Sequence, residues 1–315
     1  MTLTFSKESK TAFLFPGQGA QIVGMGRDLF ENSRAAKDIF EQVDDALNKS
    51  LSKIIFEGPD ELLKDTINAQ PSIMAVSLAC IAALRENSAT NQIDPVFIAG
   101  HSLGEYTALS VASVLSVKDT ALLVQKRGEL MQKACDANPG TMAAILGLDE
   151  MILNQITRET GTYVSNVNTD QQIVISGSNI AVAQAMDMAL TRGAKKVIPL
   201  RVGGAFHSGL MKPAIKGLIS TIDSLDFNDP TIPIIANCTA NALVDSEEIK
   251  TELVNQITGC VNWKKSVDFM IKSGATKFLE IGPGRALSGM VKRIDRSAEI
   301  ESISDLDSIV NLSKS

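Results

Sequence analysis

One serine stands where its surroundings could make it a nucleophile. Residues 100–104 read Gly-His-Ser-Leu-Gly, after the apolar run from Pro95 to Ala99 and before a helix-forming stretch from Glu105. The two glycines permit a sharp strand-to-helix turn that holds the Ser102 hydroxyl above the strand end. A bare G-x-S-x-G arises by chance in roughly one chain in ten of this length. The flanking strand and helix argue against chance and predict an activated serine, with hydrolysis as its default chemistry.

The base for this serine must be one of the chain's two histidines, because a serine hydroxyl needs a positioned base to accept its proton. His101 adjoins Ser102, and neighbouring side chains at a strand end point to opposite sides. His207 is therefore the candidate base. It follows the apolar run 197–202 and precedes a helix, so we expect it at a second strand end, where catalytic groups collect in open α/β sheets.

No acid is obviously placed as the third member of a triad. In α/β hydrolases this acid lies between the serine and the histidine in the chain, where Asp170 and Asp187 fall. Both belong to a segment that reads as an insertion. We therefore expect a Ser-His dyad whose histidine is oriented by a backbone carbonyl or an amide side chain.

A glycine loop follows the first predicted strand, at Gly17-Gln18-Gly19. A dinucleotide-binding fingerprint is excluded because Ile22 stands where its third glycine is needed. Two interpretations stay open: a plain turn, or a backbone N–H at Gln18 that binds an oxyanion. The second oxyanion donor would be the amide of Leu103, directly after the serine.

The predicted elements around these residues change character at residue 141. Strands at 11–15, 95–99, 232–236 and 277–281, with long helical patterns at 30–43, 59–86, 117–134 and 210–222, predict an α/β domain. Between them, residues 142–200 predict a βαββαβ order typical of a ferredoxin-like unit. We expect an α/β-hydrolase-like large subdomain with a parallel sheet (1–137 and 204–315) and an inserted ferredoxin-like small subdomain (138–203). Ser102 and His207 would face a cleft between them.

Composition excludes several function classes. With 44% hydrophobic and 21% charged residues in 315, the chain reads as a soluble globular protein. The apolar stretch from Pro71 to Leu84 is too short to span a membrane and predicts a buried helix. Met1 to Lys10 contain no signal-peptide core, so we expect a cytoplasmic protein. A net charge of −6 argues against nucleic acid. The tail from Ser302 is expected to be loosely held.

The four cysteines are scattered, which argues against disulfides and a zinc site and predicts buried thiols.

Five motifs in order resemble the malonyl-CoA:acyl-carrier-protein transacylase family along nearly the whole chain. They are Phe15-Pro16-Gly17-Gln18-Gly19-Ala20-Gln21, Gly100-His101-Ser102-Leu103-Gly104-Glu105-Tyr106, Lys126-Arg127-Gly128-Glu129-Leu130-Met131-Gln132, the segment 202–211 around Ala205-Phe206-His207-Ser208, and Asn255-Gln256 before Val261-Asn262-Trp263. The sequence departs from the family at Ala20, Gly203, Gly209 and Cys260, and at 168–171, where Asn-Thr-Asp-Gln replaces a common Asn-Ser-Pro-Gly turn.

The resemblance implies transfer of a malonyl group from malonyl-CoA to the phosphopantetheine thiol of an acyl carrier protein in fatty acid synthesis. It implies that Gln256 orients the catalytic histidine and that Arg127, which composition alone would place on the surface, grips the acyl carboxylate. His101, Asn168 and Phe206 complete the implied substrate site, and Leu103 with Ala205-Phe206 favours malonyl over methylmalonyl. No metal or bound cofactor is implied.

The expected partners are malonyl-CoA and an acidic carrier protein, bound by a monomer. Docking would need local positive charge, for which the candidates, equally readable as solvated surface residues, are Lys195, Lys196, Arg285, Lys292 and Arg293. Three alternatives stay open: an acyltransferase of a polyketide pathway, a serine thioesterase or esterase, and a noncatalytic module that binds carrier protein.

Overall fold

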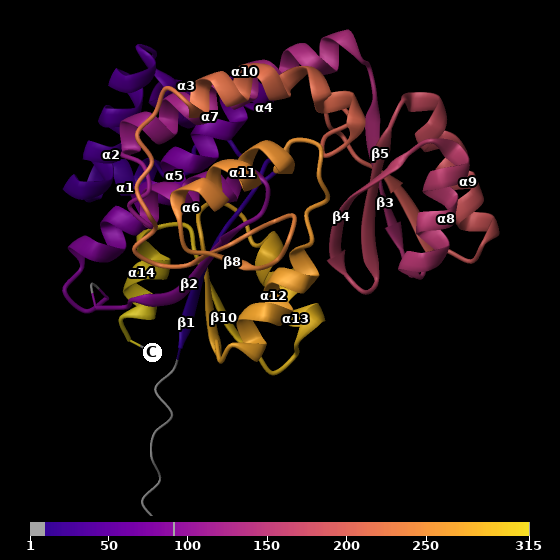
Figure 1. Cartoon of the computed structure of the whole chain (residues 1–315). Helices are drawn as coiled ribbons and strands as arrows, with labels where there is room; N and C mark the ends of the chain where they lie inside the picture. Colours follow the sequence, from indigo (N-terminus) through magenta and orange to yellow (C-terminus); the bar gives the residue numbers. More distant parts are fainter. Residues whose placement is uncertain (1–9, 91, 315) are drawn as a thin grey trace, which may run out of the picture.

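The computed structural model describes residues 10–90 and 92–314, which form two sheets with helices around them (Figure 1). In this part of the chain the larger sheet has the strand order β10-β9-β1-β2-β7-β8. All neighbours pair in parallel except β7 and β8. The strands are β1 (Thr11–Phe15), β2 (Pro95–Gly100), β7 (Ile234–Ile235), β8 (Ala242–Leu243), β9 (Lys277–Ile281) and β10 (Glu299–Ile303).

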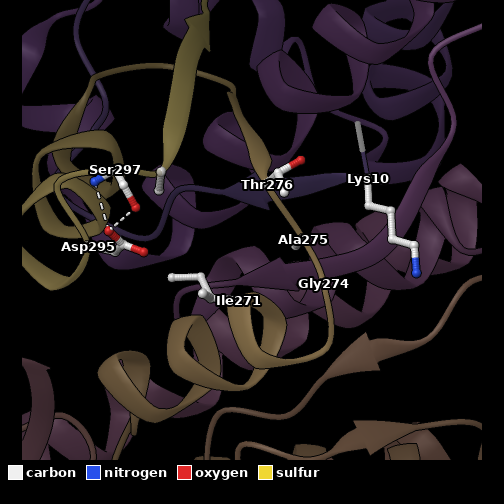
Figure 2. Close-up of a pocket in the computed structure, with 8 residues that line it drawn as sticks. Lys10, Ile271, Gly274, Ala275, Thr276, Asp295 and Ser297 are labelled. Atoms are coloured by element: carbon white, nitrogen blue, oxygen red, sulfur yellow. Dashed lines mark hydrogen bonds between the residues drawn. The ribbon is translucent and has the colours of Figure 1, made fainter. Parts of the chain in front are cut away.

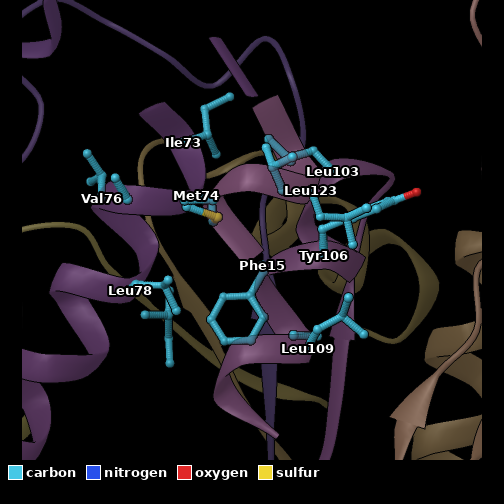
Figure 3. Packing of buried hydrophobic residues seen from close by; sticks show 14 of the residues in the cluster. Phe15, Ile73, Met74, Val76, Leu78, Leu103, Tyr106, Leu109 and Leu123 are labelled. Atoms are coloured by element: carbon cyan, nitrogen blue, oxygen red, sulfur yellow. The ribbon is translucent and has the colours of Figure 1, made fainter. Parts of the chain in front are cut away.

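The large sheet is buried on both faces, as a parallel sheet requires. Successive side chains of β1 point to opposite faces. Phe13 and Phe15 enter one apolar cluster, and Figure 3 shows Phe15 beside side chains of α5 and α6. Leu14 enters a second cluster with Trp263 and Phe278. The strands beside Ser102 therefore lie between two layers of packed apolar side chains.

Helices cover these faces. The first cluster draws mainly on helices that precede residue 223, and the second on α12 and α13. Their bounds are α1 (Arg27–Asn32), α2 (Arg34–Leu47), α3 (Leu51–Glu57), α4 (Asp60–Lys64), α5 (Thr66–Glu86), α6 (Leu103–Val111), α7 (Val117–Ala137), the 3-10 helix η1 (Gly209–Met211), α10 (Lys212–Ile222), α11 (Ser246–Gln256), α12 (Trp263–Lys272), α13 (Ala286–Ile294) and α14 (Leu306–Leu312).

Two helical patterns that read as continuous in the sequence are interrupted. Ser33 has extended backbone between α1 and α2, and its hydroxyl accepts a bond from the Ala36 amide at 3.1 Å and donates to Glu86 at 2.6 Å. Asp65 separates α4 from α5. At Ser33 the polar side chain bonds a first-turn amide of α2, which favours a new helix start over continuation. The Asp65 side chain makes no such bond.

Helix α5 is long and apolar enough to meet the length and composition of a membrane span, and 83% of its apolar window is buried inside the protein. It packs against α2 and α7 as a core helix, in agreement with the prediction for residues 71–84. Residues 1–9, on which the expectation about an export signal depends, lie outside the described residues.

The smaller sheet is antiparallel, with the order β4-β5-β3-β6. It is formed between α7 and η1 by β3 (Thr141–Leu146), α8 (Glu150–Thr160), β4 (Tyr163–Thr169), β5 (Gln172–Gly177), α9 (Asn179–Thr191) and β6 (Lys196–Pro199). Its edge strand β4 is joined to the segment before α12, since the amide of Val167 donates to Val261 O and that of Val261 to Ser165 O, both at 2.9 Å. This bridge sets the end of β4 beside the large sheet.

One expectation was wrong, and two were right only in part. The tail is ordered rather than loose, because β10 pairs with β9 along its length and Leu306 at the start of α14 donates its amide to Asp28 Oδ2 at 2.8 Å. His207 follows a strand, as expected, but this strand is β6 of the smaller, antiparallel sheet and not a strand of an open α/β sheet. Of the four cysteines, Cys80 and Cys135 are buried thiols, whereas Cys238 and Cys260 are partly exposed.

Close packing at the end of β2 explains the two glycines around Ser102. A Cβ on Gly100 would lie 1.8 Å from the carbonyl carbon of Gly104, and a Cβ on Gly104 would lie 2.1 Å from Phe15 O. The first turn of α6 thus sits against the ends of β1 and β2 at a distance that only hydrogen side chains allow.

We expect Gly100→Ala to destabilise the fold by more than about 3 kcal/mol, because backbone atoms must shift to admit the methyl group. Gly289→Ala on α13 is the matched control: nothing lies within 4 Å of its Cβ position, and alanine favours a helix by about 0.5–1 kcal/mol over glycine. Urea unfolding midpoints measure both. Equal stability of the two variants would contradict the packing argument.

Candidate active site

Ser102 occupies the turn between β2 and α6 in a backbone conformation that is rare for a residue with a side chain, φ 53° and ψ −103°. Its Oγ lies 2.7 Å from Nε2 of His207. His207, itself at φ 54°, is buried on the loop between β6 and η1. The parallel sheet thus presents the hydroxyl, and the loop returning from the smaller sheet presents the imidazole.

The tautomer of His207 follows from its second hydrogen bond. Nδ1 lies 2.8 Å from the backbone carbonyl oxygen of Gln256, at the end of α11. A carbonyl oxygen only accepts, so Nδ1 carries the hydrogen and Nε2 is free to accept the Ser102 proton. Burial, followed by the nearby Arg127 cation, lowers the pKa of His207 to about 3. The imidazole is therefore a neutral base in the resting protein.

Arg127 places a buried guanidinium beside the nucleophile. It lies on α7 with 1% of its surface exposed, and its Nη2 donates to Ser102 Oγ at 3.2 Å and to Gln256 Oε1 at 2.8 Å. Nη1 donates to Gln70 Oε1 at 2.7 Å. The guanidinium also lies over the ring of Tyr106, with Arg127 Cζ 4.8 Å from the ring centroid. Burial lowers the pKa of this guanidinium.

Within the described residues, Arg127 forms no salt bridge with a carboxylate, and its Nε is buried with no hydrogen-bond partner. The nearest compensation is indirect. Gln256 accepts from Arg127 through its amide oxygen and donates through its amide nitrogen to Glu105 Oε2 and to Ser102 O. Burial, then the neighbouring Glu252, raises the pKa of Glu105 well above its usual range. A buried cation with a spare donor and no ionic partner is suited to receive an anion.

Two backbone amides near the serine are available to an oxyanion. In the described part of the chain, neither Leu103 N–H nor Gln18 N–H has an acceptor, and Gln18 lines the same cleft as Ser102. The amide of Ser102 itself is already taken, since it donates to Asn237 Oδ1 at 2.7 Å. Leu103 N lies at the first turn of α6, where the helix dipole favours negative charge.

The cleft above Ser102 encloses about 360 Å³. It is walled by β4, by the loop 200–207 and by the glycine loop at 18–21, with Phe206 and Met131 among its apolar side chains. His101 Nε2 lies 3.0 Å from Asn168 Oδ1, so this imidazole holds the end of β4 and points away from the nucleophile. The charged residues that line the cleft are all cations: Lys64, Arg127 and Arg201.

A second cavity, of about 320 Å³, lies at the other end of the strands of the large sheet. Figure 2 shows the residues that line it. Its residues Lys10, Thr276 and Ala298 precede β1, β9 and β10, so it opens at the amino ends of strands whose carboxyl ends approach Ser102. Its carboxylate, Asp295, already accepts bonds from the amide and hydroxyl of Ser297 at 2.8 and 2.6 Å. No histidine lines it, unlike the cleft above Ser102.

Comparison with known proteins decides the family. Residues 12–309 match the model of the acyl transferase domain. The chain belongs to the acyl transferase domain family. It is 45% identical to the malonyl CoA-acyl carrier protein transacylase of Bacillus subtilis over 306 residues, covering 96% of this chain and 95% of that protein. The same-named protein of Staphylococcus aureus is 38% identical, with 96% and 97% covered.

Solved structures of the same kind superpose closely on this acyl transferase domain. The acyl-carrier-protein S-malonyltransferase of Bartonella henselae has a TM-score of 0.92 at 39% identity, covering 97% of this chain and 98% of that one. A malonyl-transacylase solved in complex with a type II polyketide acyl-carrier protein has a TM-score of 0.93 at 35% identity, with 97% and 99% covered.

The cleft above Ser102 and the residues directly behind it bring together the expected catalytic and substrate-binding residues: Ser102, His207, Gln256, Arg127, Leu103, Gln18, His101, Asn168 and Phe206. The expected dyad is present, with a backbone carbonyl behind the histidine. Asp170 instead pairs with Lys264 at 3.3 Å on the surface, and Asp187 is exposed on α9. Sequence reasoning missed Gln70, Glu105 and Asn237. Of these, Asn237 had a signal, because it follows the strand predicted at 232–236.

The low pKa of His207 predicts a flat pH profile for the attack of Ser102. A histidine of pKa about 3 remains neutral from about pH 5 to pH 8, whereas one of ordinary pKa near 6.5 would lose roughly 30-fold in neutral form at pH 5. We expect modification of Ser102 by a sulfonyl fluoride, followed by intact mass, to vary less than about 3-fold over this range. His207→Gln should react slowly throughout. A decline centred near pH 6.5 would contradict the buried, neutral base.

Proposed function

We propose that this chain transfers a malonyl group from malonyl-CoA to the phosphopantetheine thiol of an acyl carrier protein, through a malonyl ester of Ser102. The observation that carries the proposal is the buried Arg127 guanidinium, 3.2 Å from Ser102 Oγ and without a carboxylate partner among the described residues. An acyl group with a free carboxylate supplies that partner through paired, charge-assisted bonds. The family and the names of its relatives support the same substrate.

In the first half-reaction, His207 Nε2 accepts the Ser102 proton as Oγ bonds to the thioester carbonyl carbon. The amides of Leu103 and Gln18 bind the resulting oxyanion. The carbon–sulfur bond then breaks, and His207 returns the proton to the departing CoA thiolate. A general base contributes about 10²- to 10⁴-fold and an oxyanion donor about 10²- to 10³-fold, so the reaction depends on both.

In the second half-reaction, the carrier-protein thiol takes the place of the CoA thiol. His207 Nε2 accepts the thiol proton, sulfur bonds to the ester carbonyl carbon, and the proton passes to Ser102 Oγ as the carbon–oxygen bond breaks. The scheme is ping-pong because one serine serves two thiols in turn. It draws on the chain's own residues and needs no bound cofactor or metal.

The two sheets support the proposed subdomains. We assign residues 1–137 and 204–315 to an α/β-hydrolase-like large subdomain and residues 138–203 to a ferredoxin-like small subdomain. The strand order β4-β5-β3-β6, with α8 and α9 as crossovers, is the order of a split βαβ unit. Asn168 and Phe206, which reach the cleft from the small sheet and the return loop, then shape the acyl pocket, and Phe206 narrows it against a methyl branch.

The cleft's charge supports an anionic substrate arm. Lys64 and Arg201 line it together with Arg127, in a chain of net charge −6. Arg285 lies next to Gly284. A Cβ atom added to Gly284 would lie 3.5 Å from Ala20 Cβ, in the loop beside the cleft. We propose that these cations attract an acidic carrier protein and its phosphopantetheine, and that the chain acts as a cytoplasmic monomer apart from membranes and nucleic acid.

Arg127→Ala tests the carboxylate site. We expect malonyl transfer to fall roughly 30- to 3,000-fold, because a partly buried unpaired charge costs about 2–5 kcal/mol. Acetyl transfer from acetyl-CoA should be kept or should increase. The measurement is kcat/KM for both donors with carrier protein, and Arg192→Ala, which removes an exposed arginine paired with Glu159, serves as the control. Equal losses on both donors would count against the assignment.

A mass experiment separates transferase from hydrolase. After incubation with malonyl-CoA, we expect the intact protein to gain one malonyl group that Ser102→Ala does not gain. Addition of carrier protein should then move the group to the carrier. Release of free malonate instead would favour the thioesterase, and absence of any adduct would favour a noncatalytic carrier-binding module. The same transfer is measured with a carrier protein of fatty acid synthesis and with one of a polyketide pathway. The carrier that is accepted more efficiently would assign the pathway.

A further inference from the structure

The nucleophile turn is strained and must be held by its surroundings. A residue other than glycine with φ 53° and ψ −103°, as at Ser102, lies in a sparsely populated region and persists only where other contacts determine it. Gly100 and Gly104 permit the turn but donate no side-chain bond to it. Some other group must fix the direction in which Oγ points.

Asn237 bonds to two backbone groups of the turn, one on each side of His101, just before the serine Cα. Its Oδ1 accepts from the amide of Ser102 at 2.7 Å, and its Nδ2 donates to Gly100 O, also at 2.7 Å. The side chain is 1% exposed. Only one orientation of the amide satisfies both bonds, since an N–H must face oxygen and a carbonyl oxygen must face N–H.

The position of Asn237 is itself fixed. It follows β7, which pairs in parallel with β2, so the two carboxyl ends that carry Asn237 and Ser102 lie side by side. Its own amide donates to Glu105 Oε1 at 2.9 Å. Glu105 lies on α6 and also accepts from Gln256 Nε2. One buried carboxylate thus ties the Asn237 loop to the side chain that contacts Arg127.

We propose that Asn237 is a positioning residue for the nucleophile, an inference that rests on the proposed transfer reaction. It holds Ser102 in the conformation that aims Oγ at His207. It also occupies the Ser102 N–H, which leaves Leu103 N–H as the donor on this side of an oxyanion. Asn237 bonds to no reacting atom, and it acts through the backbone that leads into the serine, at Gly100 O and Ser102 N.

Aspartate at this position gives the sharpest test. An ionised carboxylate can accept from Ser102 N–H but cannot donate to Gly100 O, so Asn237→Asp breaks one bond of the two and sets two carbonyl-type oxygens against each other. A protonated aspartic acid has the same shape with one O–H donor, so it restores both bonds. Burial favours the neutral form, which brings this ionisation toward neutral pH.

The experiment measures the rate at which Ser102 is acylated by malonyl-CoA in a single turnover, by quenched intact mass, from about pH 5 to pH 9. We expect Asn237→Leu to be slower by roughly 30- to 300-fold, the scale of a small misplacement of reacting groups, with KM for malonyl-CoA within about 3-fold of the unchanged protein. Asn237→Asp should be slow at high pH and recover as pH falls, while the unchanged protein stays flat.

Asn241→Ala is the matched control. Asn241 lies in the same loop after β7 and is exposed, so the acylation rate of this variant should remain within about 3-fold of the unchanged protein. If Asn237→Leu does not fold, the pH recovery of Asn237→Asp still decides the matter. Acylation of Asn237→Asp at the unchanged rate, or a loss that does not vary with pH, would overturn the proposal.

Failure of the proposed function gives a different result. If the unchanged protein gains no malonyl group, the transfer reaction is wrong. The same variants are then compared by sulfonyl fluoride labelling of Ser102, which needs the same alignment of Oγ and His207 but no natural substrate. Equal labelling of Asn237→Asp and the unchanged protein at high pH would overturn the positioning role separately.

Discussion

The hydrogen bond between Ser102 Oγ and His207 Nε2 joins two groups that lie 105 residues apart in the chain. The serine requires the large parallel sheet, because its turn is formed where β2 meets α6. The histidine requires the smaller sheet, because its loop begins where β6 ends. Neither sheet alone places a base beside a nucleophile. The bridge between β4 and the segment before α12 therefore serves the chemistry as directly as the core does.

Burial of Arg127 is the costliest feature of this arrangement, since a desolvated cation needs compensation. The described residues supply it through amides, since Gln70 and Gln256 accept hydrogen bonds from the guanidinium. Gln256 in turn donates a hydrogen bond to Glu105. Amide oxygens satisfy donors without neutralising charge. A direct carboxylate would close the site to an acidic acyl group, whereas an amide contact leaves the positive charge available to one.

Much of this site could be predicted from sequence, for identifiable reasons. Ser102 is marked by two glycines whose spacing reflects close backbone contacts, and His207 by the scarcity of histidine. Arg127 and Gln256 could be found only by resemblance, because their roles depend on how α7 and α11 pack. Asn237 contacts a residue 135 positions away, and no local pattern encodes that pairing. The ordered tail was missed because a polar edge strand such as β10 resembles a loop in composition.

The charge of Arg127 also sets how strong a base His207 is. The guanidinium cation is one cause of the low pKa of His207, after burial. In the proposed reaction, an acyl carboxylate that pairs with Arg127 offsets this cation and so raises the proton affinity of the imidazole, which lies two hydrogen bonds away through Ser102 Oγ. The base thus becomes stronger when a dicarboxylic acyl group occupies the cleft and stays weak when a neutral acyl group or water does. The acyl group is then selected by the basicity of His207 as well as by the shape of the pocket.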